Sequence, residues 1–181
     1  MRMSDSEALM WTVERDPSLR SDFCNLTIVD GTPDPDRLRA KVALALESIP
    51  RLGQRVEEPP LRLATPEWVD DPDIDLDHHV RAVRAPGRGT TRDLLDLCGR
   101  LAERPFDRSR PLWEFTIVHG LEGGHSALLQ KVHHTVFDGV GGLRLSLAVV
   151  DLEPDADLAA RPAGGSSRVR KERGADTGRP S

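Results

Sequence analysis

Two adjacent histidines, His133 and His134, are the residues of this sequence whose types and spacing are best suited to chemistry. An aspartate, Asp138, follows His134 by four positions, and Gly139 comes directly after it. An imidazole at the edge of a loop is a competent general base, because its unperturbed pKa of about 6.5 lies near neutral pH. Asp138 could fix the tautomer of the ring or brace the loop by pairing with an arginine. Gly139 permits backbone angles that are closed to other residues.

Two other interpretations of the histidine pair stay open at this point. Adjacent histidines beside a glycine-rich turn also occur at ordinary strand ends, where they only pack and form hydrogen bonds. Histidine is also the commonest protein ligand of zinc. The spacing here lacks the two histidines at i and i+4 of a helical zinc site, however, and no cysteine lies nearby. We therefore expect no metal at this position.

A predicted β-hairpin brings the two histidines to the end of a strand. Two apolar runs, Leu112–His119 and Ser126–His133, are separated by residues 120–124, a loop of hairpin length that contains three glycines. After the pair, residues 139–150 carry apolar side chains at helical spacing. The pair is thus expected where a strand gives way to a loop that opens a helix.

The chain before the hairpin alternates between helix-like and strand-like runs. The patterns predict a short helix or turn over Ser4–Glu14, helices over 35–49 and 91–103, and strands at Phe23–Val29, Leu61–Ala64 and Val80–Val83. Thr90 and Asp93 have the spacing of a capping box that begins the third helix. Such alternation is typical of an α/β (α+β) two-layer sandwich, in which helices pack on a mixed sheet. We expect this fold for residues 1–153.

Composition and charge bear on the number of domains, on nucleic-acid binding and on the C-terminal residues. The 181 residues amount to about one domain. The 25 basic and 30 acidic side chains give a net charge of -5, which speaks against a nucleic-acid binder. From residue 154 onward Pro, Gly, Ser, Arg and Asp replace the apolar pattern, so we expect residues 154–181 to form a disordered linker or tail.

Targeting signals and cysteines point to one compartment. No stretch approaches the roughly 18 uninterrupted apolar residues of a membrane span, and the first residues lack the basic and apolar regions of a signal peptide. Cys24 and Cys98 lie far apart in apolar stretches, so we expect both to be reduced and half-buried. The expected location is the cytoplasm.

Three segments together resemble a known family. The stretch from His133 to Gly139 matches the HHxxxDG signature of the CoA-dependent acyltransferase superfamily, which includes chloramphenicol acetyltransferase. The segment Pro105–Glu114, PFDRSRPLWE, and the segment Asp75–Val80, DLDHHV, resemble stretches of the bacterial wax ester synthase/diacylglycerol acyltransferase family. The resemblance runs from about residue 5 to about residue 160.

The resemblance implies a fold and a reaction. The fold is the chloramphenicol acetyltransferase-like N-terminal domain, and the reaction transfers a fatty acyl group from acyl-CoA to the hydroxyl of a diacylglycerol or a long-chain alcohol. His134 falls on the family's general base, His133 on a supporting position, Asp138 on a structural brace and Gly139 on the motif backbone. Acyl-CoA is then a co-substrate, with no further cofactor, no metal and no acyl-enzyme.

Length is the departure from the family pattern. Members resemble two similar domains in one chain, with the active site in a tunnel between them, and from its length we expect this chain to lack the second domain. We therefore expect a truncated or split half enzyme that works with a separately encoded C-terminal half, at a membrane surface or lipid droplet. The alternative is a non-catalytic half-domain or remnant that only associates with a partner chain.

Overall fold

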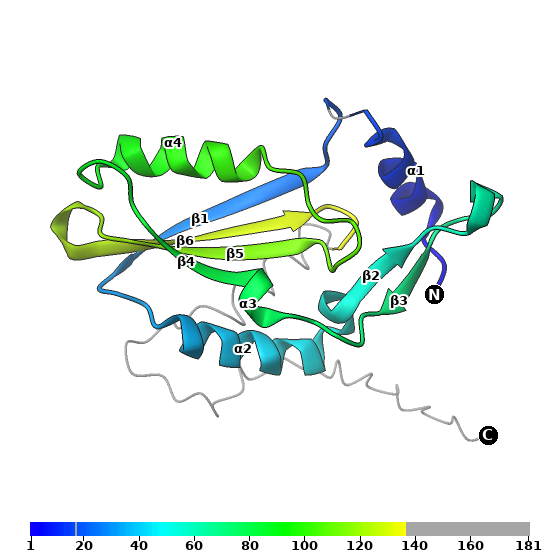
Figure 1. Cartoon of the computed structure of the whole chain (residues 1–181), viewed down its shortest axis with the longest axis horizontal. Helices are drawn as coiled ribbons and strands as arrows, with labels where there is room; N and C mark the ends of the chain where they lie inside the picture. Colours follow the sequence, from blue (N-terminus) through cyan, green and yellow to red (C-terminus); the bar gives the residue numbers. More distant parts are fainter. Residues whose placement is uncertain (17, 137–181) are drawn as a thin grey trace, which may run out of the picture.

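The computed structural model of this chain describes residues 1–16 and 18–136. The elements, drawn in Figure 1, are α1 (Asp5–Val13), β1 (Asp22–Asp30), α2 (Pro35–Ser48), β2 (Gln54–Glu57), β3 (Glu67–Asp70), α3 (Leu76–His79), β4 (Val80–Arg84), α4 (Thr91–Ala102), β5 (Trp113–His119) and β6 (His125–His133). Asp138, Gly139, the helix predicted over 139–150 and the tail predicted over 154–181 lie outside the described residues.

The central sheet is mixed, as the sequence predicts. Its strand order is β1-β6-β5-β4; β6 runs antiparallel to both β1 and β5, whereas β4 runs parallel to β5. The predicted hairpin is confirmed as β5 and β6. Its loop contains Gly120, Gly123 and Gly124, whose φ angles of 78–79° are rarely adopted by other residues. This turn sets the register that ends β6 at the histidine pair.

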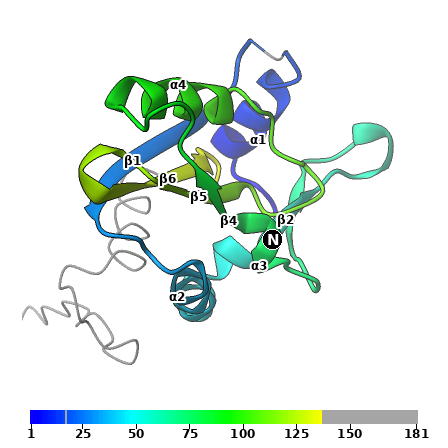
Figure 2. The ribbon, with the colours of Figure 1, turned by 60° about the vertical axis from the view of Figure 1, so that its left-hand side comes forward.

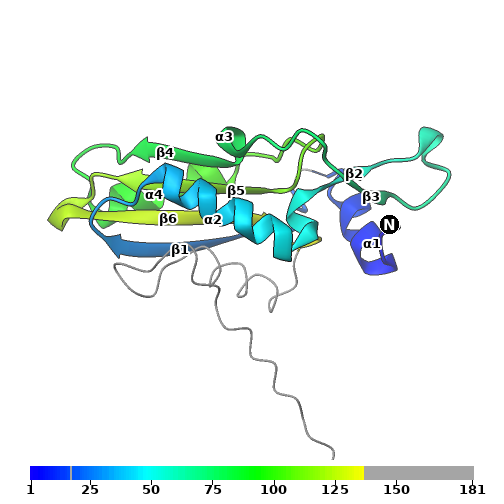
Figure 3. The same cartoon turned by 90° about the horizontal axis from the view of Figure 1, so that it is seen from below.

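Helices cover both faces of the sheet (Figures 1 to 3). Leu38 and Val42 of α2 share a buried cluster with Phe115 on one face, while Leu94 of α4 shares another with Val118 on the opposite face. The helices therefore form one layer on each side of the sheet. In a two-layer sandwich, helices would cover only one side. The physical reason is that β5 and β6 are buried on both of their faces.

Local capping signals explain where three helices begin. Ser4 and Glu7 form a reciprocal capping box at α1, and Thr90 and Asp93 form the predicted one at α4. The Asp34 carboxylate accepts a hydrogen bond from a backbone N–H in the first turn of α2. The three long helices thus begin within a residue or two of the positions that the sequence predicts.

One predicted strand, Leu61–Ala64, is wrong. The chain forms a short 3₁₀ turn at Pro60–Arg62, and Leu61 has a φ of 56°. Leu61 and Leu63 are 87% and 83% exposed, so their apolar spacing does not reflect a buried face. The strands of this region lie on either side of that turn, as the antiparallel pair β2 and β3.

The cysteines are both free, but they differ in burial. Cys98 lies in the core under α4, whereas Cys24 on β1 is exposed. The expectation of two half-buried thiols is therefore wrong for Cys24, because β1 lies at the end of the strand order with both of its faces partly open.

The N-terminal residues join α1 to the small β2–β3 sheet. The Met1 ammonium donates to the Trp68 carbonyl at 2.8 Å, and Trp11 Nε1 donates to a Glu58 carboxylate oxygen at 2.7 Å. On its other side α1 reaches the end of β6, because the Trp11 ring lies edge-on to the His133 ring with a centroid separation of 6.3 Å. Within the described ranges, no helix is both long and apolar enough to cross a membrane.

Candidate active site

The two histidines have opposite environments although they are adjacent in sequence. His133, the last residue of β6, is 2% exposed, whereas His134 opens the following turn and is exposed. Both faces of β6 are buried up to His133, whereas His134 lies one residue past the strand, where the turn leaves its side chain outside the core. The His134 backbone N–H donates to the Ser21 carbonyl at 2.8 Å, which fixes the main chain at this point.

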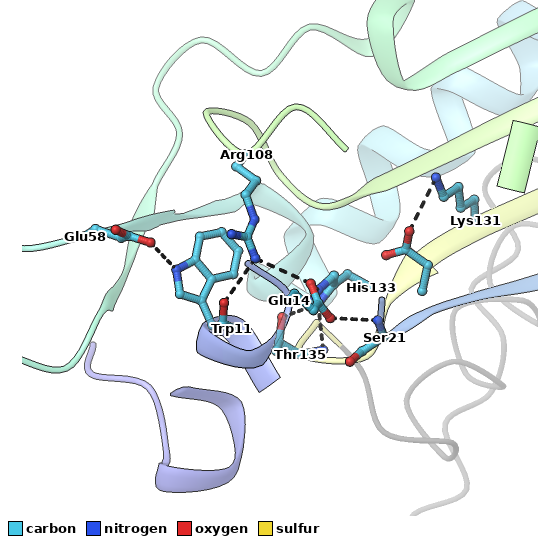
Figure 4. A network of polar contacts seen from close by, with 9 residues as sticks. Trp11, Glu14, Ser21, Glu58, Arg108, Lys131, His133 and Thr135 are labelled. Carbon is cyan, nitrogen blue, oxygen red and sulfur yellow. Dashed lines mark hydrogen bonds and ion pairs between the residues drawn. The ribbon is translucent and has the colours of Figure 1, made fainter. Parts of the chain in front are cut away.

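His133 is held by hydrogen bonds on both of its ring nitrogens (Figure 4). Its Nε2 lies 2.5 Å from a Glu14 carboxylate oxygen, and its Nδ1 accepts the Thr135 backbone N–H at 3.1 Å. A nitrogen that accepts a hydrogen bond carries no proton, so the proton of the neutral ring is on Nε2 and is donated to Glu14. His133 therefore has one tautomer and one orientation.

Glu14 is the buried anion of this network. Its side chain is 7% exposed; one oxygen accepts the Ser21 backbone N–H at 2.7 Å, and the other lies 3.4 Å from Arg108 Nη2. Burial by itself raises the pKa of Glu14, but the hydrogen bonds from His133 and Ser21 outweigh it and hold that pKa below its ordinary value. The carboxylate is thus charged at neutral pH.

Sequence reasoning missed Glu14. It lies 119 residues before His133, so no local pattern joins the two. One signal was present: Glu14 caps the C-terminal end of α1, where a carboxylate is unfavourable because the helix dipole is negative there. That signal is not specific, because Glu103 occupies the same position at the end of α4 and is exposed.

His134 faces a cleft of about 460 Å³. Its ring also contacts Phe23 of β1, with a centroid separation of 5.1 Å. Described residues from three parts of the chain line the cleft: Ser6, Glu7 and Met10 of α1, Arg51 after α2, and His134, Thr135 and Val136. An exposed imidazole at a cleft of this size is placed to reach a proton on a bound small molecule.

The two family-like segments support the strands beneath this site. The His79 ring stacks on Trp113 at 4.3 Å, and its Nδ1 lies 2.7 Å from the Trp113 carbonyl. Trp113, fully buried, donates its Nε1–H to the Leu52 carbonyl at 2.8 Å. Asp75 and Arg110 form a long ion pair of 4.0 Å between the two segments. Their residues act here through packing.

The pH dependence of stability reports on His79. Burial lowers the pKa of His79 from 6.5 to about 4, so between these values the unfolded chain binds a proton that the folded chain does not. Stability should therefore fall as the pH drops from 6.5 to 4, by up to about 3 kcal/mol from this group. The free energy of unfolding in urea, measured at several pH values between 6.5 and 4, should fall less in His79→Gln than in the native chain. The same substitution at the exposed His125 should leave the fall unchanged, and equal slopes in both variants would refute the assignment.

The described residues contain no cluster of three or more histidine, cysteine or carboxylate side chains that could hold a metal ion. Asp138 and Gly139, the other two predicted site residues, lie outside the described part, so the structure brings together only His133 and His134 of the four.

Comparison with known proteins identifies the family. Residues 3–178 match the model of the wax ester synthase/diacylglycerol acyltransferase catalytic domain. The chain belongs to this family. Mycobacterium tuberculosis H37Rv has a member named "Putative diacyglycerol O-acyltransferase Rv2484c", which is 43% identical over 165 residues, 89% of this chain and 34% of that protein. The same strain's "Probable diacyglycerol O-acyltransferase tgs3" is 42% identical over 116 residues, 64% of this chain and 43% of that protein.

Solved structures agree with the family assignment and the fold. The wax ester synthase/diacylglycerol acyltransferase from Marinobacter aquaeolei VT8 superposes with a TM-score of 0.63 at 27% identity, over 81% of this chain and 37% of that one. The starter condensation domain of rhizomide synthetase RzmA gives 0.66 at 14% identity, over 81% of this chain and 35% of that one, a likeness of fold alone. The chain spans between a third and a half of the length of these family members.

Proposed function

We propose that this chain carries the histidine base of an acyl transfer from acyl-CoA to the hydroxyl of a diacylglycerol or a long-chain alcohol. One observation carries the proposal: of two adjacent motif histidines, His133 is fixed in the core and His134 is free at a cleft. Family membership supports the reaction type, and relatives named as diacylglycerol O-acyltransferases support the lipid acceptor.

In the proposed reaction, His134 takes the proton of the acceptor hydroxyl as its oxygen attacks the thioester carbonyl. The tetrahedral intermediate then collapses, expels the CoA thiolate and leaves the new ester. The thiolate receives the proton back from the imidazolium, so His134 ends as it began. General-base assistance of this kind contributes about 10²- to 10⁴-fold to a rate.

The neighbouring residues support this base. His133 orders the turn, because its Nδ1 accepts the backbone N–H of Thr135, directly after His134. In the proposal Asp138 braces the same loop and Gly139 supplies its backbone freedom. Acyl-CoA is a co-substrate, and the scheme requires neither a metal nor an organic cofactor.

Contact with a lipid surface belongs to the same proposal, since its acceptors are lipids. Leu61 and Leu63 support it: both are more than four-fifths exposed at the turn between β2 and β3, which projects from the body of the molecule (Figure 1). Apolar side chains at such a position favour insertion at a lipid interface over contact with water.

Radiolabelled palmitoyl-CoA tests the proposed function. The chain is incubated with the label and either dioleoylglycerol or hexadecanol, by itself and together with the C-terminal remainder of a family member. We expect labelled triacylglycerol or wax ester to form in one of these mixtures, with one CoA thiol released per ester. Ester formation in neither mixture would favour the alternative of a non-catalytic domain that only binds a partner chain.

A further inference from the structure

Arg51 is the cation among the described residues that line the cleft with His134, and one of its guanidinium nitrogens has no hydrogen-bond partner among the described residues. Its Nη1 is buried without a hydrogen-bond partner among the described residues, and its Nη2 lies 3.8 Å from a Glu7 oxygen, beyond hydrogen-bond distance. The guanidinium stacks on the Trp68 ring at 4.2 Å, which fixes its position but satisfies none of its N–H groups. An oxygen of a molecule in the cleft can accept from the remaining N–H groups of this guanidinium, because the side chain is 20% exposed and lines the cleft, whereas Nη1 itself has no exposed surface.

The second charge of the cleft limits what can supply this oxygen. Glu7 is the carboxylate among the described lining residues, and both of its oxygens are occupied. One accepts the Trp68 Nε1–H at 3.2 Å, and the other accepts the Ser4 backbone N–H at 2.6 Å in the cap of α1. Glu7 is therefore a fixed negative charge beside Arg51, which repels a phosphate or carboxylate but not a neutral carbonyl.

The remaining lining residues favour an apolar molecule. Met10 and Val136 contribute apolar surface, and Ser6 and Thr135 are uncharged. A cleft with one fixed anion, one cation and an apolar wall suits a neutral lipid that bears a carbonyl oxygen better than the polyphosphate part of CoA. A 1,2-diacylglycerol carries an ester, and so a carbonyl, on the carbon next to the one that bears its free hydroxyl, whereas a long-chain alcohol has no ester.

We propose that Arg51 donates a hydrogen bond to an ester carbonyl of a diacylglycerol acceptor and thereby selects acylglycerols over simple alcohols. The inference rests on the proposed function, because it places the acceptor hydroxyl at His134 while Arg51 holds the adjacent ester. It assigns this cleft to the acceptor rather than to CoA.

Binding measurements on the whole chain test this without requiring turnover. Binding is followed by isothermal titration calorimetry, because Trp11 and Trp113 would add to the fluorescence of Trp68 beside Arg51. The chain is titrated with 1,2-dioctanoylglycerol, decanol and adenosine 3′,5′-bisphosphate, which carries phosphates like those of CoA. We expect Arg51→Met to weaken dioctanoylglycerol binding about tenfold or more, as for loss of a hydrogen bond from a charged donor, and to change decanol binding less than about threefold.

Three controls keep the result interpretable. Arg51→Lys retains the charge and the aliphatic stem, so it should fold as the native chain does and bind dioctanoylglycerol with intermediate affinity. Arg55→Met alters a neighbouring arginine of β2 outside the cleft lining and should bind like the native chain. Thermal unfolding of each variant shows whether a loss of affinity reflects a loss of fold.

Several outcomes would overturn the inference. One is an equal loss of affinity for dioctanoylglycerol and for decanol in Arg51→Met. Another is binding of the bisphosphate that depends on Arg51. A third is that the native chain does not bind dioctanoylglycerol. These results are distinct from failure of the proposed function. If dioctanoylglycerol binding depended on Arg51 but no ester formed, the acceptor site would stand and the proposed transfer would be refuted. If esters formed but Arg51→Met lost the same affinity for both acceptors, the transfer would stand and the role of Arg51 would be refuted.

Discussion

Replacing His134 by alanine should lower acyl transfer by about 100-fold or more while leaving the stability of the fold unchanged. The loss follows because the variant lacks the imidazole that faces the cleft, and general bases contribute at least this factor. Stability should be retained because the ring is exposed and its described packing partner is Phe23. The measurement is the initial rate of labelled ester formation under whichever condition supports transfer by the native chain.

His125→Ala is the matched control, since it removes an exposed histidine at the far end of the same strand. It should retain full activity. If His134→Ala lost no more activity than His125→Ala, the motif would be a structural turn and the proposed base would have to be abandoned.

Replacing Glu14 by alanine should have the largest effect on stability, a loss of about 3 kcal/mol. The substitution leaves the His133 Nε2–H and the Ser21 backbone N–H without their acceptor, and each orphaned buried donor costs about 1–3 kcal/mol. The measurement is the free energy of unfolding in urea at pH 7. Glu103→Ala is the control, because Glu103 caps the C-terminal end of α4 as Glu14 caps α1 but is exposed. It should change stability by less than about 0.5 kcal/mol.

The effect of Glu14 also has a defined pH dependence. Its pKa is lowered in the folded chain from the ordinary value of 4.5, so the folded state binds this proton more weakly than the unfolded state does. The stabilisation is then complete above pH 4.5 and is lost as the pH falls through the lower folded value. The difference between native and Glu14→Ala chains should accordingly shrink in acid. A difference that grew below pH 4.5 would show that the carboxylate is not the stabilising form.

Features that depend on neighbouring residues could be predicted from the sequence. The β5–β6 hairpin follows from two apolar runs around a glycine-rich loop, and the start of α4 follows from the Thr90–Asp93 spacing. The position of His133 and His134 at the strand end follows from the same hairpin. Each of these signals lies within a few residues of the structure that it specifies.

Features that depend on distant contacts could not be predicted. Glu14 meets His133 only because the fold places the end of α1 beside the end of β6, where the Trp11 ring also packs against His133. The apolar spacing of Leu61 and Leu63 resembled a strand because exposed leucines look like buried ones in a sequence. The opposite environments of His133 and His134 likewise follow from where the packing around β6 ends, and that boundary is a tertiary property that local sequence does not show.

Nitrogen-15 NMR of the histidine side chains tests most directly the central claim that one motif histidine is fixed in the core and the other is free to act as a base. We expect a His133 ring with a bare Nδ1 and a protonated Nε2 whose hydrogen exchanges slowly with water, because Glu14 and Thr135 hold it in the interior. That proton signal should survive in His134→Ala and disappear in Glu14→Ala. A His133 ring protonated on Nδ1, or one whose proton exchanges as fast as that of His134, would contradict the account.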